Sequence, residues 1–547
     1  FVQLPDSNFK PRKFDPRAGY FSISYFDYAT PIAEPIEKRF ITRHRLAKKD
    51  PSAPMSEPVK PIVYYMDPGA PEPIRTALME GTRWWNQAFE AAGYKDAFRV
   101  ELLPEDADPM DVRYNLINWV HRSTRGWSYG SSVTDPRTGE IIKGHVTLGS
   151  LRVRQDFLIA EGLLAPYEQG KPVSKEMEQM ALNRLRQLAA HEVGHTIGLA
   201  HAYSSSSENM ASVMDYPHPV VKLINGKIDL SQAYDDKIGA FDKVTIAYGY
   251  QDFPAGTDES KALNDIIQQS LKAGLTFLSD QDGRPVGGAH PYTHLWDNGR
   301  DAAEELNRVM EVRTVALRNF GENNIKPGTP MAMLEEVLVP MYFFHRYQIE
   351  AAVKLIGGVN YRYALRGDGQ PIAELLTPQQ ELNALEALLK TVQPSSLMLS
   401  ESLLRSIPPR PLGYSRHREL IKLRTDMMFD PLSAAETVAD GTFGLLFHPA
   451  RANRVFEHHS RDARLPSLES VIDRTISATM KSAPKTGYEG AVQMAVDYAL
   501  FVNLARLSVH KDASVQTRAI TTAKLGQLKA WLSARPAAVT LVNRAVR

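Results

Sequence analysis

The chain has no cysteine among its 547 residues. This absence excludes a disulfide framework, a zinc site built from thiolates and a cysteine nucleophile. It also excludes latency in which a cysteine of this chain blocks a metal. Cysteine usage does not fix the compartment in which the protein works.

An excess of charge of one sign and a long apolar run are also missing. Lys and Arg number 64 against 63 Asp and Glu, so the net charge is +1 and no nucleic-acid partner is expected. No apolar run reaches the roughly 18 residues that suggest a membrane-spanning helix. With 43% hydrophobic and 23% charged residues, the composition is that of a globular protein, and its length predicts two or more domains.

An export signal usually consists of a basic segment followed by an apolar one. The sequence, which begins at Phe1, shows no such pattern at its start. We expect a processed or cut chain, with an export signal in the sequence that precedes it.

Three regions differ in their patterns. Residues 1–58 are rich in proline and charge and read as an extended segment, with one alternating stretch at 20–25 that predicts a strand. Residues 59–250 show strands and helices, including a long helical pattern at 175–198. Residues 251–547 are mostly helical by pattern. The predicted elements of the second region are strands at 61–66, 98–103, 115–120 and 141–148, one more strand between Gly130 and the turn at 135–139, and a helix over 73–92. Those of the third region are helices at 331–356, 377–391, 488–508 and 515–533.

The strongest motif is HEVGHTIGLAH at residues 191–201. Residues four apart on a helix project from one face, so His191 and His195 can both reach one zinc ion at about 2.0–2.1 Å. Glu192 lies to the side, where it can act on water as a general base without binding the metal. Gly198 is suited to end the helix, after which the chain can return His201 as a third ligand.

Three protein ligands leave a fourth position open, which is typical of a catalytic zinc site. The competing interpretation is two surface histidines on an amphipathic helix and an unrelated third. Because the pattern fixes five positions, its chance occurrence in a chain of this length is on the order of 10⁻⁵ to 10⁻⁴.

The sequence SVMDY follows at residues 212–216, and with the zinc motif it resembles the metzincin clan of metalloproteases. The resemblance implies that Met214 forms an apolar floor beneath the histidines. It also implies that Tyr216 binds zinc or stabilises the transition state; the alternative is a tyrosine packed under the helix. Ala202, after the third histidine, points to no particular subfamily.

A narrower resemblance covers nearly the whole chain. Stretches such as FDPRAGYFSISY, DPRTGEIIKG and HPYTHLWDNGRDAAEEL are similar to large bacterial zinc-dependent metalloproteases with a metzincin core and a long helical C-terminal region. The implied fold class is α+β, a metzincin-like catalytic domain with a twisted mixed sheet and an active-site helix, followed by a mostly α-helical domain. The resemblance implies that the protein is a zinc-dependent endopeptidase. It also implies that the protein is exported to the periplasm or secreted.

The implied substrate is a peptide or protein in extended conformation, bound along the edge of the sheet. We expect that edge at Val146, Thr147, Leu148 and Gly149, unless this is an interior strand. Two other functions stay open: a catalytically silent scaffold or peptide-binding protein, and a zinc hydrolase that acts on a non-peptide substrate.

Other candidate positions are weaker. His218 follows the methionine turn closely and is expected at the wall of the cleft or on the surface. His290 and His294 have ligand-like spacing but lie in a loop rich in Gly, Pro and Asn, so a second metal is not favoured. Residues 280–283, DQDG, resemble a calcium loop only faintly and lack its later glutamate, so no calcium site is assigned.

Overall fold

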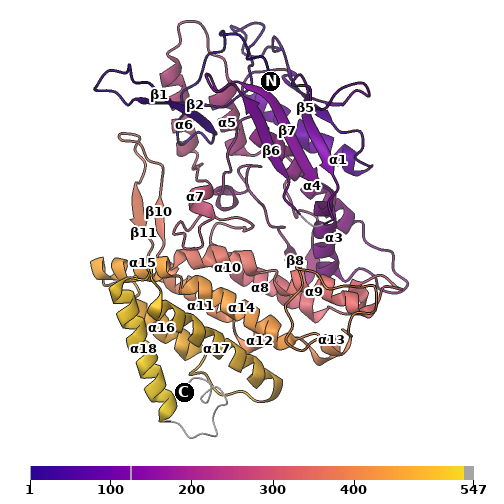
Figure 1. Ribbon diagram of the computed structural model, residues 1–547, viewed down its shortest axis with the longest axis vertical. Coiled ribbons are helices and arrows are strands. Elements are labelled where there is room, and N and C mark those ends of the chain that lie inside the picture. Colours follow the sequence, from indigo (N-terminus) through magenta and orange to yellow (C-terminus); the bar gives the residue numbers. More distant parts are fainter. Residues whose placement is uncertain (1, 124–125, 535–547) are drawn as a thin grey trace.

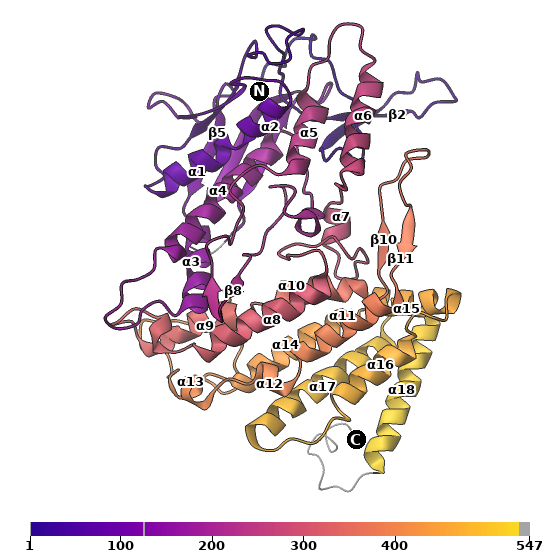
Figure 2. The same ribbon diagram turned by 180° about the vertical axis from the view of Figure 1, so that it is seen from behind.

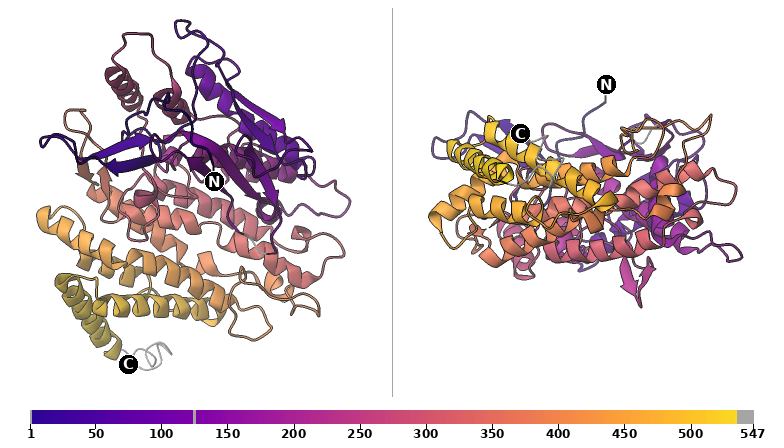
Figure 3. Two further views of the ribbon diagram at one scale, coloured as in Figure 1. Left: turned by 45° about the horizontal axis from the view of Figure 1, so that its top comes forward. Right: turned by 90° about the horizontal axis from the view of Figure 1, so that it is seen from below.

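The computed structural model describes residues 2–123 and 126–534. It has two parts, which lie one above the other in Figure 1 and at opposite ends in Figure 2 and in the left view of Figure 3. A twisted mixed sheet and its helices form the first part, and stacked helices form the second. In the described part of the chain, no helix has the length and apolar character needed to cross a bilayer.

The main sheet has five strands in the order β4-β3-β5-β7-β6. Neighbouring strands are parallel except for β6, which runs antiparallel to β7. The strands are β3 (Ile62–Met66), β4 (Phe98–Leu102), β5 (Asn115–Val120), β6 (Tyr129–Thr134) and β7 (Ile141–Gly149). The strands predicted at 61–66, 98–103, 115–120 and 141–148 are therefore confirmed.

The predicted substrate edge is wrong. Val146, Thr147, Leu148 and Gly149 belong to β7, which pairs with β5 on one side and with β6 on the other. Their backbone groups are already used inside the sheet. The sheet ends on this side at β6 and on the other side at β4, and the polar sequence of β6, YGSSVT, carries little of the hydrophobic pattern that marks a strand.

The helices of the first part pack on this sheet and on one another. They are α1 (Ile74–Arg83), α2 (Trp85–Ala91), α3 (Leu151–Leu164), α4 (Glu176–Thr196), α5 (Ala240–Tyr250) and α6 (Glu259–Lys272). The helix predicted over 73–92 is present but breaks at Trp84, and α3 had no counterpart among the predicted elements. The long helix predicted at 175–198 is confirmed as α4, which packs against α1, β6 and β7.

The N-terminal segment is part of the first core. Its strands β1 (Ser22–Phe26) and β2 (Glu37–Ile41) form an antiparallel pair. Tyr20, just before β1, is 3% exposed, and its hydroxyl donates to the carbonyl oxygen of Thr245 on α5 at 2.8 Å. The region predicted as an extended segment thus lies against the sheet and helices of the first part.

The second part is built almost entirely of helices. Its elements, after the small hairpin β8 (Lys222–Ile224) and β9 (Lys227–Asp229), are α7 (Asp280–Gly283), α8 (Ala302–Arg318), α9 (Leu334–Tyr342), α10 (Arg346–Ala352), α11 (Pro378–Thr391), α12 (Pro394–Leu397), α13 (Glu401–Arg405), α14 (Pro431–Leu446), α15 (Pro449–Arg461), α16 (Leu468–Ala478), α17 (Gly487–Val509) and α18 (Val515–Ser533), with the hairpin of β10 (Val359–Tyr361) and β11 (Ala373–Leu375). The predicted helix at 331–356 is interrupted between α9 and α10.

Helix α4 belongs to both hydrophobic cores. Leu185, Ala189 and Val193 in its C-terminal half pack into the core of the first part. Met177 and Met180 in its N-terminal half pack into the core of the second part, together with Ala160 of α3. The helix that carries the zinc motif is therefore held by both parts of the molecule.

Candidate active site

Two histidines face one another at the C-terminal end of α4. His191 and His195 are 1% and 8% exposed, and their Nε2 atoms lie 3.1 Å apart. Leu188, Ala189 and Val193 anchor this stretch of helix in the core, so the two rings have a fixed direction. The spacing of four residues places them on one face, as predicted.

The third histidine reaches the same point because the chain reverses after the helix. Gly198 has φ +106°, a conformation that suits glycine, and a Cβ there would lie 2.0 Å from the carbonyl oxygen of Thr42. After this turn the N–H of Leu199 donates to the carbonyl oxygen of Gly194 at 3.0 Å. His201 then returns to within 4.8 Å of the other two histidines, measured between their possible ligand atoms.

Each imidazole uses its Nδ1 atom to hold its orientation. The partners, each at 2.8 Å, are the carbonyl oxygen of Val213 for His191, the carbonyl oxygen of Leu199 for His195 and a carboxylate oxygen of Asp280 for His201. An acceptor at Nδ1 requires the proton there, which leaves Nε2 with its lone pair free. The Nε2 atom of His201 is buried and has no hydrogen-bond partner.

These features fit a zinc ion. The three Nε2 atoms converge, and burial lowers the pKa of His191 well below its usual value and that of His195 to about 3, so both rings are neutral at pH 7. Neutral imidazoles with an outer hydrogen bond to oxygen are the usual ligands of catalytic zinc.

The methionine turn lies under α4. Met214 is 2% exposed and packs against Gly194. The turn is fixed by the buried carboxylate of Asp242, which accepts hydrogen bonds from the Ser212 hydroxyl at 2.6 Å and from the Val213 N–H at 2.9 Å. Met214 therefore packs against the helix turn that carries His191 and His195.

Glu192 is buried beside the histidines at 4% exposure. Burial raises the pKa of its carboxyl to about 8, while Arg184 and the backbone N–H of Gly130 oppose that rise. A Cβ on Gly130 would lie 2.2 Å from the carbonyl oxygen of Glu192, so the edge strand β6 runs directly along the helix at this point. The carboxylate is thus placed between the histidines and the open edge of the sheet.

Tyr216 completes the ring of side chains around the histidines. Its ring centroid lies 5.0 Å from that of His191 and 4.8 Å from that of His201, and it stacks on Trp296 at 4.9 Å. Arg284 donates to its hydroxyl at 3.5 Å, a long hydrogen bond. The hydroxyl therefore lies at the rim of the candidate metal site.

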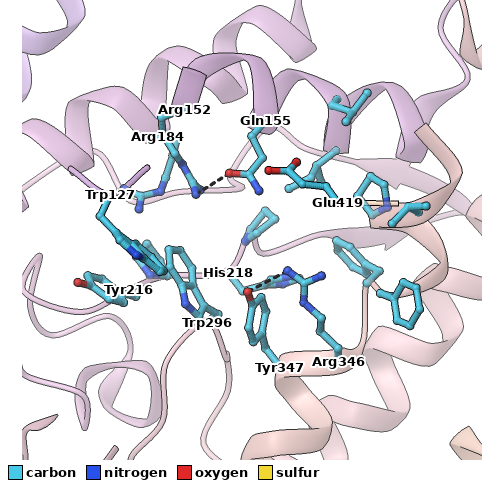
Figure 4. Close-up of a pocket in the computed structure, with 18 of the residues that line it drawn as sticks. Trp127, Arg152, Gln155, Arg184, Tyr216, His218, Trp296, Arg346, Tyr347 and Glu419 are labelled. Atoms are coloured by element: carbon cyan, nitrogen blue, oxygen red, sulfur yellow. Dashed lines mark hydrogen bonds between the residues drawn. The ribbon is translucent and has the colours of Figure 1, made fainter. Parts of the chain in front are cut away.

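A cavity of about 290 Å³ opens beside Glu192 and Tyr216. Its walls come from α3 and α4 on one side and from α9 and α10 on the other, so both parts of the molecule form it. Figure 4 shows Arg152, Arg184 and Gln155 along one wall and Arg346 and Tyr347 along the opposite wall. His218 lines this cavity, with its ring 4.6 Å from that of Phe344, in agreement with the expected place at the cleft wall.

Three residues of the site had no predicted role: Asp280, Arg284 and Trp296. All lie beyond residue 250, in the region predicted as a separate helical domain. Asp280 belongs to the DQDG stretch, which forms helix α7. Nothing in the local pattern marks these positions, because their function depends on where the fold returns them.

His290 and His294 lie apart from the histidine cluster. Both rings are buried; the Nε2 of His290 is 3.0 Å from the carbonyl oxygen of Tyr361, and that of His294 is 3.4 Å from a carboxylate oxygen of Glu350. The one group in the described part of the chain with three metal-ligating side chains this close together is His191, His195 and His201.

Comparisons with known proteins agree with this geometry. The family model described as Met-zincin matches residues 173–487, more than half of the chain, and it continues past residue 250. A model for a domain of unknown function matches residues 1–49. No curated protein and no solved structure matches. The family match and the convergence of the three histidines of the motif show that this chain belongs to the Met-zincin family.

Proposed function

We propose that this chain is a zinc-dependent endopeptidase in which His191, His195 and His201 hold one zinc ion. The observation that carries the proposal is the common direction of three Nε2 atoms, each freed by an oxygen acceptor at Nδ1. Bound zinc would supply Lewis-acid chemistry, lowering the pKa of water toward about 7 and polarising a carbonyl.

Glu192 is the proposed general base. Its carboxyl group is shielded from solvent on the helix turn that carries His191 and His195, and the positive charge of a bound zinc ion would favour its ionised form. In that form it can take a proton from the attacking water and pass it to the leaving amine. The carbonyl oxygen of the substrate gains negative charge as the water attacks. The Tyr216 hydroxyl, at the rim of the site with Arg284 beside it, is the proposed donor to that oxygen.

The edge strand β6 is the proposed binding site for an extended peptide. Among the described strands it pairs only with β7, which leaves its other side available for hydrogen bonds with substrate backbone. Gly130, near the start of the strand, lies next to Glu192, and Trp127 and Ser128, just before the strand, line the cavity. A peptide added here would bring a backbone carbonyl to the histidines. We further propose export to the periplasm or beyond, on the resemblance to exported bacterial metalloproteases.

The decisive experiment incubates the full chain with a denatured protein, with and without a metal chelator, beside the variant Glu192→Gln. Cleavage that the chelator stops, that returns with zinc and that is lost by orders of magnitude in the variant supports the proposal. Zinc binding without cleavage would favour a silent scaffold. Full activity of a fully metallated Glu192→Gln variant would show that another group is the base.

A further inference from the structure

The cavity beside Glu192 has an inner end that carries positive charge. It runs from Glu192 and Tyr216 along α4, past Leu188, to Arg184. These positions on α4 are four residues apart and therefore share one face of the helix. A side chain adjoining the scissile bond would enter past an apolar wall and meet a guanidinium at the far end.

Arg184 is a buried cation without a carboxylate partner. It is 2% exposed, and it donates to the side-chain oxygen of Gln187, while its Nε atom has no partner. Its guanidinium lies 5.9 Å from the ring centroids of both Tyr234 and Trp296. Among the described residues, no carboxylate oxygen lies within 4.0 Å of it.

Arg152 brings a second guanidinium to the same end. It pairs with the buried carboxylate of Asp156 at 2.9 Å and donates to Gln155 at 3.2 Å. One carboxylate thus compensates two guanidinium groups. Burial and then Arg152 lower the pKa of Arg184 to about 10, so it remains charged at neutral pH. Keeping an uncompensated buried charge is unfavourable unless a ligand supplies the counter-charge.

Other charged groups offset only part of this excess at the inner end. Glu336, on α9, is held by Arg410 at 2.8 Å. Glu419 lines the cavity from a loop but is exposed, so water and salt screen its charge. Arg346 adds a further cation on the opposite wall. Glu192, two helix turns away beside the histidines, offsets part of the charge of Arg184.

We propose that this cavity selects an acidic side chain, Asp or Glu, in the substrate residue that adjoins the scissile bond. Its carboxylate is received by Arg184 together with Arg152. Planar guanidinium groups bind carboxylates through two parallel hydrogen bonds, which favours a carboxylate over the amide of the same shape. The inference rests on the proposed peptidase function, because the scissile bond defines which residue enters.

A purely structural role for Arg184 is the competing explanation. Gln187, which accepts from Arg184, also donates to the carbonyl oxygen of Val213 in the methionine turn at 2.9 Å. Loss of Arg184 would then disturb the turn and slow the cleavage of every substrate. If the role is structural, loss of Arg184 lowers kcat/KM by the same factor for all peptides. If the role is selective, it changes the ratio of kcat/KM between acidic and neutral peptides.

The experiment uses the full chain with zinc and matched fluorogenic peptides that differ only by Glu or Gln, placed in turn on each side of the scissile bond. We expect kcat/KM to favour Glu about tenfold or more at one of the two positions. Arg184→Met should bring that ratio close to one. Arg186→Met is the matched control on the same helix, because Arg186 pairs with Glu80 at 2.8 Å away from the cavity and should keep the ratio.

Equal cleavage of Glu and Gln peptides at both positions by the unaltered protein would overturn the inference while leaving the peptidase function intact. A uniform loss in Arg184→Met with an unchanged ratio would overturn it as well. Binding of the same peptides to Glu192→Gln, followed by fluorescence anisotropy, tests the cavity without turnover. Tighter binding of the Glu peptide supports the inference even if no peptide is cleaved, and equal binding contradicts it. Because this binding measurement uses Glu192→Gln, it tests the cavity even if Arg184→Met does not fold.

Discussion

The contact between His201 and Asp280 makes a quantitative prediction. Asp280 is on α7, in the sequence region predicted as a separate domain, and accepts from His201 Nδ1 at 2.8 Å. The change is Asp280→Ala, which removes the acceptor that holds the third imidazole in place. Its other carboxylate oxygen accepts a hydrogen bond from the Nε of Arg284, so the change also removes the carboxylate partner of that guanidinium.

A hydrogen bond to a charged group contributes about 1.5–3 kcal/mol, and outer partners of metal-binding histidines typically change metal affinity by about 10–100-fold. The Asp280 side chain is 39% exposed, so water can replace part of what is lost. We therefore expect zinc affinity to weaken by about tenfold to thirtyfold, or roughly 1.4–2 kcal/mol.

The assay is competition for zinc between the protein and a chromogenic chelator. Asp265→Ala is the control, because Asp265 is also half-exposed and has one ion pair, with Lys261 at 3.0 Å on α6. Its affinity for zinc should equal that of the unaltered protein. If Asp280→Ala binds zinc within threefold of the unaltered protein, the carboxylate does not position His201 and the reasoning is wrong.

Three further predictions concern single residues. Tyr216→Phe should lower kcat about 100-fold with zinc content unchanged, as expected for an oxyanion donor worth about 2.7–4 kcal/mol; turnover within a few-fold would leave Tyr216 as a packing residue. Gly198→Ala should lower Tm by several degrees in thermal unfolding, because φ is +106° and the added Cβ meets backbone; an unchanged Tm would contradict this. Burial raises the pKa of Asp497 to about 7, so the folded state holds a proton that the unfolded state has released above about pH 4. Stability is therefore lost as pH rises from about 4 to 7, on the order of 4 kcal/mol, and denaturant titrations of Asp497→Asn should show a flatter pH profile over that range.

The helical content of the second part was accessible from the sequence because amphipathic patterns of 14 residues or more depend mainly on local spacing. Helices α11, α17 and α18 begin and end within one or two residues of the predicted ranges. The predicted helix at 331–356 failed at its middle, where the chain turns between α9 and α10. The apolar pattern continues through that break because the turn itself is buried, so periodicity alone does not reveal it.

The edge of the sheet illustrates the opposite case. The apolar strand β7 has an evident pattern, whereas β6 is polar and has little. The pattern indicates which residues are buried, but a strand between two others and a strand at an edge differ in hydrogen bonding, which depends on pairing with distant segments. The sequence therefore predicted a strand on each side of the turn at 135–139 but did not indicate which of the two lies at the edge.

What the sequence determined by itself is the local geometry of the zinc motif. A spacing of four on a helix, a glycine after it and a methionine turn depend on backbone conformation over 26 residues, from 191 to 216. The tertiary structure decided everything that links this segment to distant residues: the carboxylate behind His201, the strand at the open edge and the cationic end of the cavity. The physical reason is that a partner contributed from a distant part of the chain leaves no periodic trace in the sequence, since only the folded chain brings Asp280 to His201 or α9 to α3.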